Sequence, residues 1–158
     1  MSTLEVKAIQ APSGYDLQMP AGHILQVVQA QYSTNTTTTS TSFVTSGLNA
    51  TITPSSTSNK ILVSFSIEAY TNSTDYCYVT AFRGTVSGTN LGNSVGGLGF
   101  VRTDAYVYSP ISNAILDSPS TTSAQTYTVG FRSNGAGTVG VCYTKNAVAT
   151  LTLMEVQG

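Results

Sequence analysis

The side chains that could perform acid–base or nucleophilic chemistry are few in this sequence and lie far apart along it. The only histidine, His23, follows a glycine at the start of an apolar segment, and we interpret it as a turn or interface residue. The carboxylates form no close pair and no regular metal-ligand spacing. They are Glu5, Asp16, Glu68, Asp75, Asp104, Asp117 and Glu155. The sequence therefore predicts no catalytic, cofactor or metal site and favours a protein that is not an enzyme. A glycosidase-like pair of carboxylates assembled across a subunit boundary stays open as an alternative.

Other residue types with possible binding chemistry have simpler interpretations. The cluster Gly92, Gly96, Gly97 and Gly99 lacks the Lys-Ser/Thr ending of a phosphate loop, which favours a flexible loop. Tyrosines can stack on sugar rings, but they are also common in strands and interfaces, which we favour here. Those tyrosines include Tyr70, Tyr76, Tyr78, Tyr106, Tyr108 and Tyr127. Arg83 and Arg132, each at a strand end, are interpreted as solvated charges, with interfacial ion pairs as the alternative.

Two cysteines, Cys77 and Cys142, stand far apart inside expected strands. That spacing fits neither a metal site nor a redox motif. We interpret them as two buried thiols. A disulfide would need facing strands and an oxidising compartment, and this alternative remains open.

The composition excludes several classes of partner. Only 8% of the 158 residues are charged, against roughly 25% in typical soluble domains. The formal net charge is −1, and the six basic residues are scattered singly, so no basic stripe exists for phosphates. No apolar run reaches the roughly 20 residues that a membrane span needs. We expect neither nucleic acid nor membrane as a partner.

The pattern of apolar residues predicts strands throughout, after an extended arm at residues 1–22. Residues 61–69 alternate most cleanly, with Val63, Phe65 and Ile67 on one face. Residues 76–83 are expected to form a hairpin with 61–69, and residues 139–143 a hairpin with 127–132. Residues 84–99 are expected to form a long loop, and 32–42 a loop leading into an edge strand. Further strands are expected at 24–30, 43–44, 48–53, 105–109 and 149–156.

These elements predict an all-β protein with a single jelly-roll or β-sandwich domain at residues 23–158 and about eight to ten strands. Several strands carry apolar residues on both faces, which is more than one sandwich can bury, so we expect self-association. The residues predicted to line the subunit boundary are Leu25, Val27, Cys77 and Val79.

The arm carries short apolar pieces separated by Pro12, Gly14 and Pro20, so it cannot form one amphipathic helix. It can lie extended in a groove or add a strand to a neighbouring sheet. Its predicted contact residues are Leu4, Val6, Ile9, Tyr15, Leu17 and Met19.

Three segments, 22–29, 52–63 and 151–156, resemble a group of phage and cyanophage virion proteins described as tail-fibre-like or structural. The resemblance spans about residues 22 to 158, and the segment 52–63, ITPSSTSNKILV, is its most specific part. It implies a virion component with a trimeric jelly roll of the TNF or C1q type, and no catalytic residue.

The short arm favours a capsid cement or decoration protein that contacts the major capsid protein. The usual description of the family favours a tail protein, that is, a tail-fibre or receptor-binding tip that recognises a host surface polysaccharide. Both hypotheses place the homotrimer in the virion.

Overall fold

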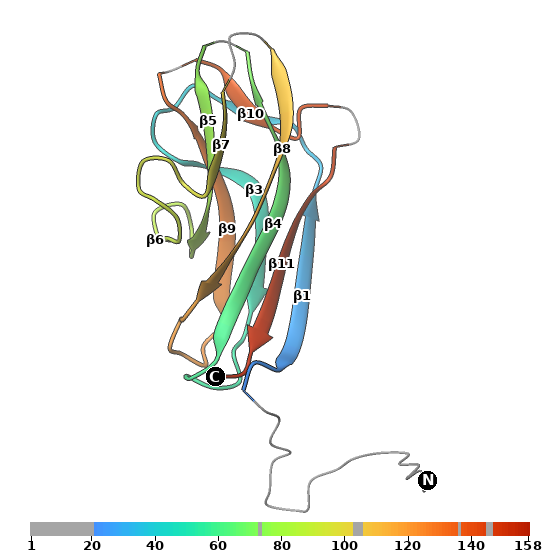
Figure 1. The fold of residues 1–158 in the computed structure, drawn as a ribbon, viewed down its shortest axis with the longest axis vertical. Helices are drawn as coiled ribbons and strands as arrows, with labels where there is room; N and C mark the ends of the chain where they lie inside the picture. Colours follow the sequence, from blue (N-terminus) through green and yellow to red (C-terminus); the bar gives the residue numbers. More distant parts are fainter. Residues whose placement is uncertain (1–20, 73, 103–105, 136, 145–146) are drawn as a thin grey trace, which may run out of the picture.

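The computed structural model describes residues 21–72, 74–102, 106–135, 137–144 and 147–158. Within these ranges the chain forms eleven strands and no helix, and two antiparallel sheets pack face to face (Figure 1). The first sheet contains β1 (Ile24–Tyr32), β2 (Thr36–Thr38), β4 (Lys60–Thr71), β8 (Val107–Asp117), β10 (Val139–Val141) and β11 (Ala149–Val156). The second sheet contains β3 (Val44–Ile52), β5 (Tyr76–Arg83), β6 (Thr89–Asn90), β7 (Gly99–Arg102) and β9 (Gln125–Ser133). The predicted all-β sandwich is confirmed.

The strand pairing is nested, which defines the fold as a jelly roll. β1 pairs with β11, β3 with β9, β4 with β8 and β5 with β7, so the chain folds back on itself like one long hairpin. Pairing of β11 with β4 and of β9 with β5 then rolls this hairpin into two sheets. The C-terminus lies beside the start of β1, where Gly22 N donates to Gln157 O at 2.8 Å (Figure 1).

Both predicted hairpins are wrong. β4 and β5 belong to different sheets, and so do β9 and β10. The connections cross the sandwich because the apolar face of each strand is buried against the opposite sheet. Asp75 holds both crossings: its carboxylate accepts hydrogen bonds from Tyr76 N at the start of β5 and from Gly135 N and Gly137 N after β9, at 2.7 to 3.1 Å.

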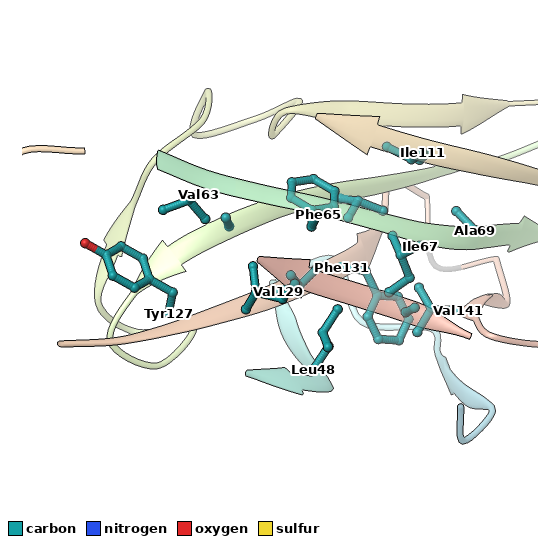
Figure 2. Packing of buried hydrophobic residues seen from close by; sticks show 14 of the residues in the cluster. Leu48, Val63, Phe65, Ile67, Ala69, Ile111, Tyr127, Val129, Phe131 and Val141 are labelled. Atoms are coloured by element: carbon teal, nitrogen blue, oxygen red, sulfur yellow. The ribbon is translucent and has the colours of Figure 1, made fainter. Parts of the chain in front are cut away.

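The core lies between the sheets, and β4 supplies one continuous side of it. The alternation predicted for this strand is confirmed, because Val63, Phe65 and Ile67 are each at most 2% exposed. Figure 2 shows Val63 and Ile67 on the side of β4 where Val129 and Phe131 of β9 and Leu48 of β3 lie, and Phe65 belongs to the same buried cluster. Tyr127 closes one end of the core, and its hydroxyl donates to Asp117 Oδ2 at 2.7 Å.

β8 is longer than the strand predicted at 105–109, since it continues past Pro110 to Asp117. Proline has no backbone N–H to donate to a neighbouring strand. A proline in the sequence is therefore usually interpreted as the end of a strand. Among the described residues β8 pairs only with β4, so one of its edges makes no ladder bonds. Edge strands tolerate proline for this reason.

β3 is one strand, although the sequence predicted two pieces, 43–44 and 48–53. A register shift between Thr45 and Asn49 keeps it paired with β9. Gly47 lies in this irregular stretch with a φ of 92°, and the ring of Tyr32 packs directly against its Cα. Only glycine fits both conditions.

We expect Gly47→Ala to destabilise the fold more than Gly22→Ala. A Cβ at Gly47 would lie 2.4 Å from Tyr32 Cζ, whereas one at Gly22, which has a similar φ of 87°, would meet nothing within 4 Å. Gly22→Ala isolates the backbone strain, about 1–2 kcal/mol. Denaturant unfolding of both variants checks this, and equal costs would show that Tyr32 moves aside freely.

Candidate functional site

The surface of the first sheet that points away from the core is the candidate functional site, and we call it the outer face. It spans β1, β11, β4 and β8, and its side chains align in cross-strand rows. The three central rows contain Val27, Met154, Leu62 and Leu116; then Gln29, Thr152, Ser64 and Ala114; then Gln31, Thr150, Ser66 and Ser112.

The first row is apolar across all four strands. Val27 is 56% and Leu116 48% exposed, while Met154 and Leu62 between them are partly buried by their neighbours. Cross-strand neighbours on one face have Cβ atoms about 5 Å apart, so the four side chains form a continuous strip. Such a strip on a free chain is a candidate contact surface.

The next two rows carry hydroxyl, amide and methyl groups and no charge. Ser112 Oγ donates to Ser66 Oγ at 2.8 Å, and Gln29 Nε2 donates to Thr152 Oγ1 at 3.1 Å. Ser66 Oγ and Thr152 Oγ1 accept in these bonds and keep their own hydrogen to donate, whereas Ser112 Oγ has used its hydrogen and can still accept. The charged residues of β4 on this face, Lys60 and Glu68, stand at either end of the three rows.

Beyond Glu68 the outer face ends in a cluster of tyrosines. The ring of Tyr70 stacks on Tyr143 at a centroid distance of 4.4 Å and on Tyr108 at 5.3 Å, with Tyr106 at 6.3 Å. Tyr143 follows Cys142, whose φ of 52° turns the chain after β10. Burial, and then the neighbouring phenols, raise the pKa of Tyr70 above its ordinary value. The cluster adds aromatic area to the end of the uncharged rows.

The structure separates the four residues predicted to line the subunit boundary. Leu25 and Val27 are 41% and 56% exposed on β1, so they are available for a contact. Cys77 and Val79 are fully buried between the sheets of a single chain, and the prediction that they line a boundary is wrong. Both faces of β5 carry apolar residues, and packing against the first sheet makes the face with Cys77 and Val79 the inner one.

The six predicted contact residues of the arm lie outside the described residues. They are Leu4, Val6, Ile9, Tyr15, Leu17 and Met19.

Both cysteines are free and buried, which confirms the interpretation as two buried thiols. Cys77 Sγ lies 3.8 Å from Gly140 O, and burial raises the pKa of this thiol to about 12. A thiol in that state is a poor nucleophile. The cysteines therefore act as core side chains.

Two carboxylates are buried, and neither makes an ion pair with a cation among the residues that the structure describes. Glu155, 1% exposed, accepts hydrogen bonds from Gln26 Nε2, Ser55 N and Asn59 Nδ2 at 2.5 to 2.6 Å. Burial by itself would raise the pKa of Glu155, but these bonds outweigh it and hold the pKa below its ordinary value. Asp75, 6% exposed, has the same balance: burial opposes ionisation, and hydrogen bonds led by Ser133 Oγ lower its pKa. Through these bonds both carboxylates hold loops of the chain in place.

The two arginines interpreted as solvated charges bond to other parts of the chain instead, so that interpretation is wrong. Arg83 Nη1 pairs with Asp117 at 3.2 Å and links the end of β5 to the end of β8. Arg132 donates to three backbone carbonyls, those of Thr41, Val95 and Ser133. Its guanidinium also lies 4.6 Å from the centroid of the Tyr78 ring. Both arginines tie segments of the sandwich together.

Sequence reasoning missed Met154, Leu116 and Tyr143 as surface residues of the site. Leu62 and Met154 stand at outward positions of alternating strands, and this signal was present in the sequence. Their alignment with Val27 and Leu116 depends on the register of three strand pairs, which is not a local property.

The fold and the surface define the class of this protein: a jelly-roll domain whose outer face has three uncharged central rows. No family model and no curated protein matches the chain. Among the described residues, no helix is long and apolar enough to cross a membrane. The same residues contain no group of three or more His, Cys, Asp or Glu side chains arranged to hold a metal ion.

Proposed function

We propose that this chain is a non-enzymatic structural protein of a bacteriophage virion, a homotrimeric cement or decoration protein on the capsid surface. The observation that carries the proposal is the outer face, with three rows of uncharged side chains across four strands. Depletion of charge at the centre of a surface is characteristic of protein interfaces. The resemblance of residues 22–29, 52–63 and 151–156 to virion proteins supports the location.

A second copy of the same chain suits this face better than a charged partner. The apolar row can pack against its counterpart, and the hydroxyl rows can bond to identical groups, which both donate and accept. In a trimer with cyclic symmetry, the residues nearest the threefold axis meet the same residues of the other two subunits, so the outer face would lie at that axis, and the rest of each contact joins two different surfaces.

We expect the purified full-length protein to sediment as a particle of three times 16.5 kDa. Leu62→Arg, which places a charge in the middle of the apolar row, should give monomers because an unpaired charge would be desolvated in the interface. Thr89→Arg on β6, exposed on the second sheet, is the matched control and should stay trimeric. Sedimentation velocity at micromolar concentration measures both.

A wild-type protein that sediments only as a 16.5 kDa species would refute the trimer. If Leu62→Arg stays trimeric, the interface lies elsewhere than on the outer face.

The virion location is tested by copy number and by deletion of the arm. A decoration protein is present in hundreds of copies per particle and a fibre tip in far fewer, so quantitative mass spectrometry of virions separates the two hypotheses.

Removing residues 1–22 should leave a trimer that fails to attach to particles lacking the protein. Full occupancy by the truncated protein would refute the anchoring role of the arm.

A further inference from the structure

The outward side of the second sheet carries two adjacent hollows, each lined by hydroxyl and apolar side chains. The larger, about 530 Å³, is lined by Thr41, Ser42, Phe43, Val86, Ser87, Ser94, Val95 and Arg132. The smaller, about 370 Å³, is lined by Thr45, Asn49, Thr85, Val86, Thr126 and Thr128. Val86 lines both, so the hollows are neighbours. Their volumes lie within or near the range of roughly 300–1,000 Å³ that is usual for ligand sites.

Each lining contains four serine or threonine side chains; the surface exposed in the larger hollow is mostly polar, and that in the smaller one is mostly apolar. Small apolar areas from Phe43, Val86 and Val95 lie among them. A ligand that matches this surface has many hydroxyl groups of its own and also C–H faces, which describes a sugar ring better than a peptide or a lipid. Two neighbouring hollows suit two successive units of a saccharide chain.

Arg132 makes the larger hollow different from the smaller one, because it is the one charged residue in either lining. The residue is only 8% exposed, yet its recorded bonds go to neutral carbonyl groups. Within the described part of the chain, the one ion pair is that of Arg83 with Asp117, so Arg132 has no carboxylate partner there.

A nearly buried cation without a counter-ion is costly, and an anionic ligand reduces that cost. Arginine has five N–H donors, of which the recorded bonds use three, and its planar geometry suits a carboxylate. Thr41, Val95 and Ser133 hold the guanidinium in place through their carbonyl groups, so little side-chain freedom is left to lose on binding.

We infer that the two hollows bind an acidic polysaccharide. The carboxylate of a uronic acid unit pairs with Arg132 in the larger hollow, and a neighbouring neutral sugar occupies the smaller one. This binding activity is separate from the structural role proposed above and does not depend on the trimer, because the hollows lie on the second sheet. It would give a surface protein of a virion a weak contact with a polysaccharide coat.

The test is calorimetric titration of the full-length protein with uronate oligosaccharides: oligogalacturonate, alginate fragments, and an alternating glucuronate and N-acetylglucosamine hexasaccharide. Each is compared with its carboxyl-reduced counterpart. We expect at least one acidic oligosaccharide to bind, with affinity falling about tenfold or more on reduction. Failure of all three to bind at millimolar concentration, or equal binding of reduced and acidic forms, would overturn the inference.

Substitutions locate the site without removing Arg132, whose bonds also support the fold. Ser94→Trp fills the larger hollow from an exposed position and should abolish binding. Ser123→Trp, exposed and outside both linings, is the control and should bind like wild type. Melting temperatures establish that both variants are folded. Unchanged binding by a folded Ser94→Trp would place the ligand elsewhere and overturn the assignment. Sedimentation of the same samples reports separately on the trimer.

Discussion

Replacing Phe65 with alanine should lower the free energy of unfolding by about 3–5 kcal/mol. Phe65 is 2% exposed at the middle of the inward face of β4, and its ring packs in the central cluster between the sheets (Figure 2). The substitution removes the transfer energy of the ring and leaves a cavity that neighbouring strands, fixed in their ladders, cannot fill. Denaturant unfolding measures the loss.

The adjacent position on the same strand supplies the control. Ser64 points to the outer face, so Ser64→Ala should change stability by less than about 0.5 kcal/mol. Leu62→Ala should be intermediate, and its cost should depend on protein concentration if the outer face is a subunit interface. A Phe65→Ala protein with an unchanged melting temperature would mean that the two faces of β4 are assigned backwards.

Asp75→Asn should destabilise the fold by about 2–6 kcal/mol. The carboxylate accepts bonds from Ser133 Oγ and from the backbone N–H groups of Tyr76, Gly135 and Gly137. An amide has one acceptor oxygen, and its NH2 group faces donors, so at least two buried donors lose their partner at about 1–3 kcal/mol each. The loss should be visible in thermal and denaturant unfolding.

The same residue makes stability depend on pH. The folded pKa values of Asp75 and Glu155 lie below their ordinary values, so the unfolded chain binds more protons as the solution is acidified. Their contribution is fully present above the unfolded values, about pH 4, and is lost as the pH falls toward the folded ones. The melting temperature of the wild type should therefore drop below about pH 4, and less steeply in Asp75→Asn or Glu155→Gln. A slope unchanged by both substitutions would contradict this assignment.

The sequence alone determined the class of fold and the orientation of the best-patterned strands. In 61–69, Val63, Phe65 and Ile67 alternate with serine and glutamate residues, so this face of the strand is the better candidate for the core. Residues 149–156 behave in the same way and form β11. The absence of apolar residues at helical spacing excluded helical classes of fold, for a physical reason that is local to each segment.

Only the tertiary structure decided which strands share a sheet, which side of β5 is buried and what the outer face contains. On β5, both sides carry side chains with apolar surface, Tyr76 and Tyr78 on one and Cys77 and Val79 on the other, so alternation did not choose between them. The choice came from contact with the inward face of the opposite sheet. In the same way, the short segments after β4 and β9 permitted hairpins, but burying both apolar faces required crossings. Strand register is non-local, and it places Val27, Met154, Leu62 and Leu116 in one row although they come from four distant parts of the chain.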